Sequence, residues 1–389
     1  MGGYSRVDLA EKRKVFVVIE RRADYSRYRP ILQRMKTDPF FEIYLVVTGI
    51  CLLDIHGKDV NYIKDDGFEI NAQLKMFNAN CPDTGGEMVR SMARVMSSLV
   101  DELEKAKPDI VLSGFDIGAN MAVTIAAAHM NIPVAHIQGG EVTGSIDESI
   151  RHAMSKFAHI HFPATELSKQ RLMRMGEKSD NIYMVGCPSI DVICETPKVD
   201  IKTLESYFNL DFEKPILLMI QHPVTTESED SFSQIKETVD AIKEANVQTV
   251  ALLPNNDAGY LKIIDYIKQS GIKWFPSLPT DIFINLYRNV SALIGNSSSG
   301  IHETPTMKIP AINIGNRQQG RERAGNVIDV PHEKNAIIAA IHKSLNDKNF
   351  LQKVKNIQNP YGNGTSADKI VEILKTVSLD NLIQKQFVD

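Results

Sequence analysis

The chain has 389 residues, of which 43% are hydrophobic and 24% are charged, and its formal net charge is −4 at pH 7. This composition is typical of a folded globular protein and argues against a disordered chain. The length predicts two domains, and the absence of a basic excess or basic stripe argues against a nucleic-acid partner.

The first half of the chain alternates between apolar runs and helical patterns, which predicts a parallel sheet covered on both faces. The runs that predict buried strands are Val15–Glu20, Phe41–Gly49, Asp109–Ser113, Val134–Ile137, His159–Pro163 and Ile182–Val185. Helical spacing predicts a helix from about Ser26 and further helices at Glu87–Ala106, Ala119–Met130, Asp147–Lys156 and Glu166–Met175.

After Gly186 a charged segment intervenes and the alternation restarts. Strands are expected at Ile216–Gln221, Thr249–Pro254, Ala292–Gly295 and Ala311–Gly315, and helices at Ser233–Ala245, Tyr260–Ser270, Asn335–Leu345 and Ala367–Val377. We therefore predict an α/β protein of two doubly wound Rossmann-like domains. Residues 1–187 form the first, completed by a C-terminal helix within 366–389, and residues 188–365 form the second. Ligands bind at the carboxyl ends of such strands, so the active site is expected in the interdomain cleft.

Several kinds of site and location are not indicated. There is no GxGxxG after the first strand and no GxxxxGK[ST], so neither a dinucleotide fingerprint nor a P-loop is present. The four scattered cysteines form no CxxC pair, which predicts reduced thiols and no zinc site. The polar N-terminus and the lack of a long apolar run predict a cytoplasmic protein without a membrane partner.

Three polar clusters follow predicted strands of the second domain. In GNSSSGIHE, Ser297, Ser298 and Ser299 precede a helix and either bind an anion or only cap that helix, and Glu303 could hold the hydroxyls of a ribose. In NRQQGRERAGN the arginines either clamp a diphosphate or form a solvated loop. His222, in QHPVTT, either is a buried core group or faces the cleft, where it donates to a phosphate or moves a proton.

The first domain offers mainly acids at its strand ends. The turn ERRADYS could direct Arg21 or Arg22 into the cleft, or could be a solvated turn. Asp116, in SGFD, lies where a catalytic acid or base would lie, or caps the next helix. The stretch HIQGGEVTGSIDESIRH adds Glu141 and Asp147, and Asp147 could simply cap its helix. Acids in one domain and phosphate donors in the other indicate an enzyme that acts on a nucleotide sugar.

Seven motifs, in order, resemble the hydrolysing UDP-N-acetylglucosamine 2-epimerases of sialic-acid biosynthesis, over about Val15 to Val377. They are RADYS, HIQGGEVTGSIDESIRHAMSKFAHIH, GCPSID, QHPVTT, PNNDAG, GNSSSGIHE and NRQQGRE. The resemblance implies a two-domain glycosyltransferase-B-like fold. It also implies elimination of UDP, a glycal-type intermediate, and hydration to N-acetylmannosamine. It further implies no metal or redox cofactor, a UDP-sugar as ligand, and a homodimer or homotetramer.

The resemblance also assigns roles to residues. It implies a UDP site of Arg22, Ser297, Ser298, Ser299, Glu303, Arg317 and Arg321. It implies catalytic positions at Asp116, Asp147, His222 and Gln138, and sugar contacts by Glu141, His152, Asn255 and Asp257.

Two positions depart from the family pattern. Ile117 stands where the family has an arginine, and Gln138 stands for the first acid of HIEGGE. Glutamine cannot accept a proton, so either another group has taken that role or the sugar differs. The leading hypothesis is the UDP-N-acetylglucosamine enzyme. The alternatives are a 2-epimerase for another nucleotide sugar, such as the diacetamido sugar of legionaminic-acid synthesis, a binding protein without turnover, and a glycosyltransferase on fold alone.

Overall fold

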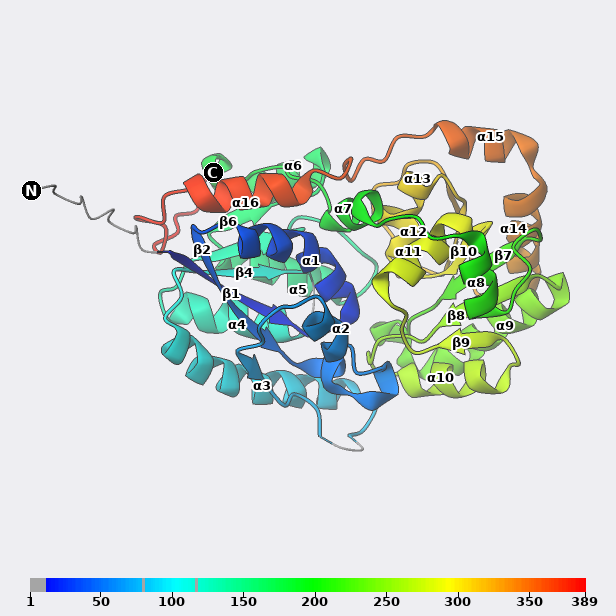
Figure 1. Ribbon diagram of the computed structural model, residues 1–389, viewed down its shortest axis with the longest axis horizontal. Coiled ribbons are helices and arrows are strands. Elements are labelled where there is room, and N and C mark those ends of the chain that lie inside the picture. The colour runs from blue at the N-terminus through cyan, green and yellow to red at the C-terminus, as the bar shows by residue number, and fades with distance from the viewer. Residues whose placement is uncertain (1–11, 79–80, 116–117) are drawn as a thin grey trace, which may run out of the picture.

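The structure is a computed structural model that describes residues 12–78, 81–115 and 118–389. It consists of two α/β halves side by side, each built on a parallel six-stranded sheet (Figure 1). The strand order is β3-β2-β1-β4-β5-β6 in the N-terminal half and β12-β11-β10-β7-β8-β9 in the C-terminal half. Both orders reverse direction next to the first strand, as in doubly wound Rossmann-like sheets. The predicted fold class is therefore confirmed.

The elements of the N-terminal half surround the first sheet. Its strands are β1 (Arg13–Ile19), β2 (Phe41–Val47), β3 (Ala72–Gln73), β4 (Ile110–Gly114), β5 (Val134–Ile137) and β6 (Ile160–Phe162). Its helices are α1 (Arg22–Thr37), α2 (Val60–Asp65), α3 (Gly85–Ala106), α4 (Gly118–His129), α5 (Asp147–Phe157), α6 (Glu166–Arg174) and the C-terminal α16 (Ser366–Thr376). Short 3-10 turns lie at Gly49–Leu52, Asp54–His56 and Ser179–Asn181.

The C-terminal half repeats this arrangement. Its strands are β7 (Ile216–Ile220), β8 (Gln248–Leu252), β9 (Lys273–Phe275), β10 (Ala292–Gly295), β11 (Ala311–Ile314) and β12 (Val327–Val330). Helix α7 (Pro188–Glu195) connects the two halves and packs against α1 and α16. The remaining helices of the C-terminal half are α8 (Ile201–Phe208), α9 (Ser231–Ala245), α10 (Tyr260–Gln269), α11 (Thr280–Asn289), α12 (Ser299–His302), α13 (Thr304–Met307), α14 (Lys334–Asn346) and α15 (Lys348–Asn356), with a 3-10 turn at Thr225–Asp230.

Alternation along β1 explains why every residue from Val15 to Ile19 is apolar. Val15, Val17 and Ile19 belong to a core on one face of the sheet, and Phe16 and Val18 to a core on the other. Successive side chains of a strand point to opposite faces, so a strand covered on both sides needs apolar residues at every position. Helix α16 contributes Ala367, Ile370, Val371 and Leu374 to the first of these cores and lies beside α1 (Figure 1).

Two predicted elements require correction. Ile182–Val185 is not a strand, because Ile182 makes only an isolated bridge with His161. The first helix begins at Arg22 rather than near Ser26. The Asp24 carboxylate accepts a hydrogen bond from the Arg21 amide at 2.8 Å and fixes the helix start within a charged segment that apolar spacing does not reveal.

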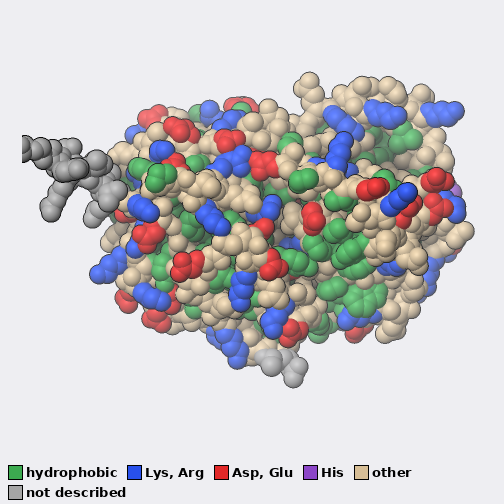
Figure 2. Space-filling model, viewed as in Figure 1, with side chains coloured by type: hydrophobic (Ala, Val, Ile, Leu, Met, Phe, Trp, Pro, Cys, Tyr) green, Lys and Arg blue, Asp and Glu red, His purple; other side chains and the backbone are tan. Residues whose placement is uncertain are grey.

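The surface shows no concentration of one sign of charge on the face in Figure 2, where acidic and basic side chains alternate over both halves. Within the described ranges, no helix is long and apolar enough to cross a membrane.

Candidate active site

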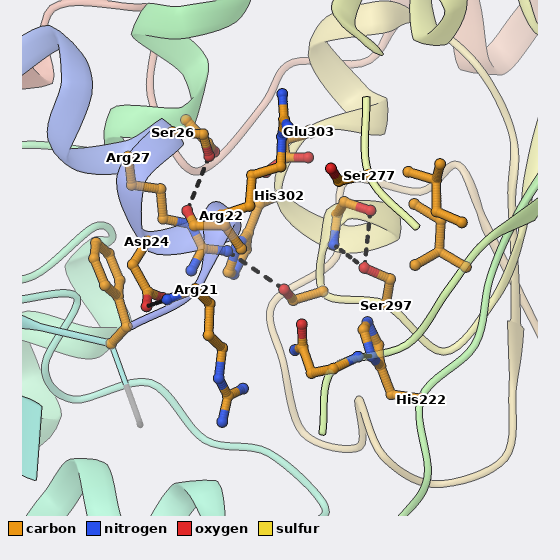
Figure 3. A pocket seen from close by; sticks show the side chains of 18 of the residues that line it. Arg21, Arg22, Asp24, Ser26, Arg27, His222, Ser277, Ser297, His302 and Glu303 are labelled. Atoms are coloured by element: carbon orange, nitrogen blue, oxygen red, sulfur yellow. Dashed lines mark hydrogen bonds between the residues drawn. The ribbon is translucent and has the colours of Figure 1, made fainter. Parts of the chain in front are cut away.

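A cleft between the two sheets is lined by both halves (Figure 3). The N-terminal half contributes the start of α1, with Arg21, Arg22, Asp24 and Arg27, and residues that follow β4 and β5. The C-terminal half contributes residues that follow β7, β8, β9 and β10, and the loop after β11. Both sheets therefore direct the carboxyl ends of their strands into one cleft, as such sheets do at ligand sites.

Most of the residues expected from the sequence line this cleft. They are Arg22, Gln138, Glu141, Asp147, His222, Asn255, Ser297, Ser298, Ser299, Glu303, Arg317 and Arg321. Asp257 is absent from the lining but pairs with a lining residue, Arg21. His152 is also absent from the lining and lies on α5, with a carboxylate oxygen of Glu148 at 3.9 Å. Asp116 and Ile117 lie outside the described residues.

The serine loop after β10 begins at a position where only glycine fits. Gly295 has φ +131, and an added Cβ would lie 2.1 Å from the carbonyl oxygen of Ile220. The loop is then ordered by Ser297, whose Oγ accepts from the Ser299 amide at 3.3 Å and lies 3.0 Å from the Ser299 hydroxyl. Arg27 donates across the cleft to Ser298 Oγ at 3.4 Å. Hydroxyls and a guanidinium thus converge where an anion could bind.

His222 is fixed in a single neutral form. The main-chain N–H of Asn255 donates to Nδ1 of His222 at 3.2 Å, so in the neutral ring the proton is on Nε2. Burial, reinforced by Arg317 and Arg21, lowers the pKa of His222 well below its ordinary value. The side chain of Asn296 holds the His222 main chain with hydrogen bonds of 2.7 and 2.8 Å. His222 is therefore suited to donate a hydrogen bond rather than to carry charge.

Arg317 connects the two halves at the start of α5. Its Nη2 lies 3.4 Å from Oδ2 of Asp147, and its Nη1 donates to the carbonyl oxygen of Asn296 at 3.3 Å. Its own carbonyl oxygen accepts from the Gly144 amide at 3.1 Å. A Cβ at Gly144 would lie 2.0 Å from the Asn316 carbonyl oxygen, so glycine permits this close approach. An expected catalytic acid and an expected phosphate ligand are thus direct neighbours.

Glu141 is the centre of a second contact between the halves. Its Oε2 accepts from Arg321 at 2.6 Å and lies 3.0 Å from Nε2 of His302. Burial opposes the charge of Glu141, but His302 and Arg321 outweigh burial and lower the pKa of its carboxyl well below the ordinary value. Burial lowers the pKa of His302 to about 4. Glu141 is therefore ionised, held by Arg321, and a poor proton acceptor.

Two arginines at the start of α1 also have carboxylate partners. Arg21 lies 3.2 Å from Asp257 across the cleft. Arg22 lies 3.2 Å from Asp59, and its guanidinium is 4.3 Å from the ring centre of Tyr62. Asp59 also accepts from the Ser277 hydroxyl of the other half at 2.8 Å.

Sequence reasoning missed several residues of this cleft. His302 lies inside GNSSSGIHE, but its partner Glu141 is 161 positions away and no local pattern connects them. In the sequence, Asn296 stands out only as part of an Asn-Ser-Ser triplet. Asp24 and Arg27 lie within RADYSR, at the start of α1, and the sequence prediction began this helix only near Ser26. Ser277 follows the short edge strand β9, which the sequence did not predict.

Comparisons with known proteins agree on one family. A family model described as UDP-N-acetylglucosamine 2-epimerase matches residues 33–375. The chain is 36% identical over 375 residues to a UDP-N,N′-diacetylbacillosamine 2-epimerase (hydrolyzing) of Legionella pneumophila, covering 95% of this chain and 98% of that protein. It is 33% identical over 387 residues to a GDP/UDP-N,N′-diacetylbacillosamine 2-epimerase (hydrolyzing) of Campylobacter jejuni, covering 97% and 99%.

Similarity to enzymes named for N-acetylglucosamine is lower. A UDP-N-acetylglucosamine 2-epimerase of Neisseria meningitidis is 28% identical over 381 residues, covering 97% of this chain and 99% of that protein. A crystal structure of UDP-GlcNAc 2-epimerase from Neisseria meningitidis, bound to UDP-GlcNAc, superposes with a TM-score of 0.78 at 23% identity, covering 93% and 99%. At that identity the superposition shows the fold alone.

Proposed function

The chain belongs to the UDP-N-acetylglucosamine 2-epimerase family, and on this premise we propose that it is a hydrolysing 2-epimerase of a UDP-diacetamido sugar of the N,N′-diacetylbacillosamine type. A base removes the proton on C2 while the C1–O bond to UDP breaks, which leaves a glycal-type intermediate. Water then adds its hydroxyl at C1, and a proton returns to C2 from the opposite face. UDP and the free 2-epimer are released.

The C-terminal half is proposed to hold UDP. Arg317 and the hydroxyls of Ser297 and Ser298 bind the diphosphate, and the neutral His222 donates from Nε2 to a phosphate oxygen. Glu303, buried and close to Arg27, accepts from the ribose hydroxyls. Support comes from their position around one cleft, where charge-assisted hydrogen bonds to a diphosphate are strong.

The proton steps are assigned to aspartates. Gln138 cannot take up a proton at neutral pH, and Glu141 is held as a carboxylate by Arg321. Asp147 lines the cleft beside Arg317, and we propose that it moves a proton at C2 together with Asp116.

One observation carries the choice of sugar. The relatives at 36% and 33% identity are both named for diacetylbacillosamine, whereas the Neisseria meningitidis relative named for N-acetylglucosamine is at 28%. N,N′-diacetylbacillosamine has a second acetamido group and a methyl group where N-acetylglucosamine has hydroxyls. Replacement of the family's acid by Gln138 and of its arginine by Ile117 makes the sugar end less charged, which suits a less polar sugar.

A second candidate substrate is UDP-N-acetylglucosamine, which would release N-acetylmannosamine. The description of the family model favours it. Both sugars should be incubated with the protein in D2O, and UDP release and deuterium at C2 followed by NMR. We expect kcat/KM to be at least about tenfold higher for the diacetamido sugar, the order of discrimination that one hydrogen-bonded group gives. The opposite preference would support the second candidate, and turnover of neither sugar would contradict the proposed enzyme.

A further inference from the structure

Gln138 occupies a strained position where the chain leaves β5. Its backbone φ is +59, in the left-handed region that residues other than glycine rarely adopt. Its main-chain N–H donates to the carbonyl oxygen of Phe162 at 2.9 Å, and only 3% of the residue is exposed. Since Gln138 also lines the cleft, this strain fits a side chain directed toward a ligand.

The orientation of the Gln138 amide group is set by its neighbour. Nε2 donates to Oε1 of Glu141 at 2.9 Å, while the other oxygen of that carboxylate accepts from Arg321. An ionised carboxylate only accepts, so the amide nitrogen must face Glu141 and the amide oxygen must point away. That oxygen is buried and has no hydrogen-bond partner among the described residues. A buried acceptor without a partner is costly unless a ligand supplies a donor.

We propose that Oε1 of Gln138 accepts a hydrogen bond from the N–H of an acetamido group on the sugar, an inference that rests on the proposed nucleotide-sugar function. The carboxylates of Glu141 and Asp147, which also line the cleft, are themselves acceptors and cannot satisfy this oxygen. An amide N–H has a fixed direction and needs an acceptor in one place. A hydroxyl can instead rotate toward either carboxylate, so the fixed oxygen of Gln138 selects for an acetamido sugar.

Binding measurements with Gln138→Met test this assignment. Calorimetry should be done in the Asp147→Asn background, so that sugars are not consumed, with UDP, UDP-glucose, UDP-N-acetylglucosamine and UDP-N,N′-diacetylbacillosamine. We expect about threefold to tenfold weaker binding of one or both acetamido sugars, the usual effect of one neutral hydrogen bond. UDP and UDP-glucose should change by less than about twofold. Equal losses for UDP-glucose, or no loss for any sugar, would overturn the proposal.

Gln138→Glu gives an independent pH-dependent readout. Two carboxylates at this distance raise one another's pKa, so at acidic pH the pair formed by the new carboxyl group and Glu141 retains one proton. The protonated form of the new side chain then reproduces glutamine, with an O–H toward Glu141 and a carbonyl oxygen toward the sugar. At higher pH the pair loses that proton and the two charges repel.

In the same Asp147→Asn background, we therefore expect Gln138→Glu to bind UDP-N-acetylglucosamine about as well as the protein that retains Gln138 at acidic pH, and progressively less well as the pH rises. The other charged or titratable groups that interact with Glu141 are common to both proteins and cancel in the comparison; they are Arg321, His302, Arg151, Tyr361 and Cys187. Parallel pH profiles would overturn the proposal. Failure of the proposed function, seen as no turnover of any sugar by the unchanged protein, leaves these binding ratios readable.

Discussion

Asn296→Ala should test whether the serine loop and His222 form one unit. Asn296 is fully buried after β10, and its side chain makes two hydrogen bonds to the main chain of His222. Alanine would leave a buried N–H and a buried carbonyl of His222 without these partners, at about 1–3 kcal/mol each. The expected loss in the free energy of unfolding is therefore about 2–6 kcal/mol.

The variant should also bind UDP more weakly. The ring of His222 would no longer be held against the main-chain N–H of Asn255, so the hydrogen bond proposed from His222 to a phosphate oxygen would weaken. The Kd for UDP should therefore rise about tenfold. Differential scanning calorimetry should show a decrease in Tm of about 5–15 °C, and titration calorimetry should show the change in UDP affinity. If Asn296→Ala does not fold, Asn296→Asp keeps the acceptor for the His222 amide, and only its protonated form donates to the His222 carbonyl, so relative to the unchanged protein it should lose less stability at acidic than at neutral pH.

Asn289→Ala is the matched control. Asn289 is exposed at the end of α11, also in an Asn-x-Ser triplet, and its side chain only donates to the Asn285 carbonyl at 2.7 Å. Its loss should be within about 0.5 kcal/mol. An Asn296→Ala protein with the Tm and UDP affinity of this control would refute the reasoning.

Three further outcomes are expected. Arg317→Ala should weaken UDP by about 1.5–3 kcal/mol in calorimetry, whereas Arg323→Ala, outside the cleft, should not. Asp147→Asn should lower turnover by a factor of about 10²–10⁴. UDP should bind equally well or more tightly, because a negative charge beside the phosphates is removed. Near-normal turnover would exclude Asp147 from catalysis. Burial opposes the charge of Glu177, but hydrogen bonds from a histidine and two lysines lower its pKa to about 2. This stabilisation is present above about pH 4.5 and is lost as the pH falls through about 2. Between pH 6 and 3 the free energy of unfolding of the unchanged protein should therefore fall by about 1–2 kcal/mol more than that of Glu177→Gln. If the exposed control Glu372→Gln differed from the unchanged protein by the same amount, the assignment to Glu177 would be contradicted.

The central strands could be predicted because they are buried on both faces. The runs in β1 from Val15, in β7 and in β10 are continuously apolar and can be recognised without knowledge of their partner strands. The edge strand β6 is buried and was predicted, but the edge strands β3, β9 and β12 could not be predicted in this way. Strands β9 and β12 contain half-exposed residues, and β3 is only two residues long. Whether these segments form strands therefore depends on the neighbouring strand rather than on their own sequence pattern.

The candidate site was partly predictable for a related reason. Residues that follow central strands, such as His222 and Ser297, could be placed in the cleft from the strand pattern and the resemblance. Their partners could not, since each contact joins segments far apart in the sequence. Arg321 was expected at the diphosphate, and its contact with Glu141, 180 positions away, became visible only in the structure.

Contacts across the cleft suggest how nucleotide binding and proton transfer are coupled in the proposed reaction. Arg317 lies 3.4 Å from Asp147, so the group proposed to bind the diphosphate is also a partner of the group proposed to move the proton. A diphosphate that takes hydrogen bonds from Arg317 weakens this contact and adds negative charge nearby. Both effects make the Asp147 carboxylate a better proton acceptor. The base would then become competent only when a nucleotide sugar is in place.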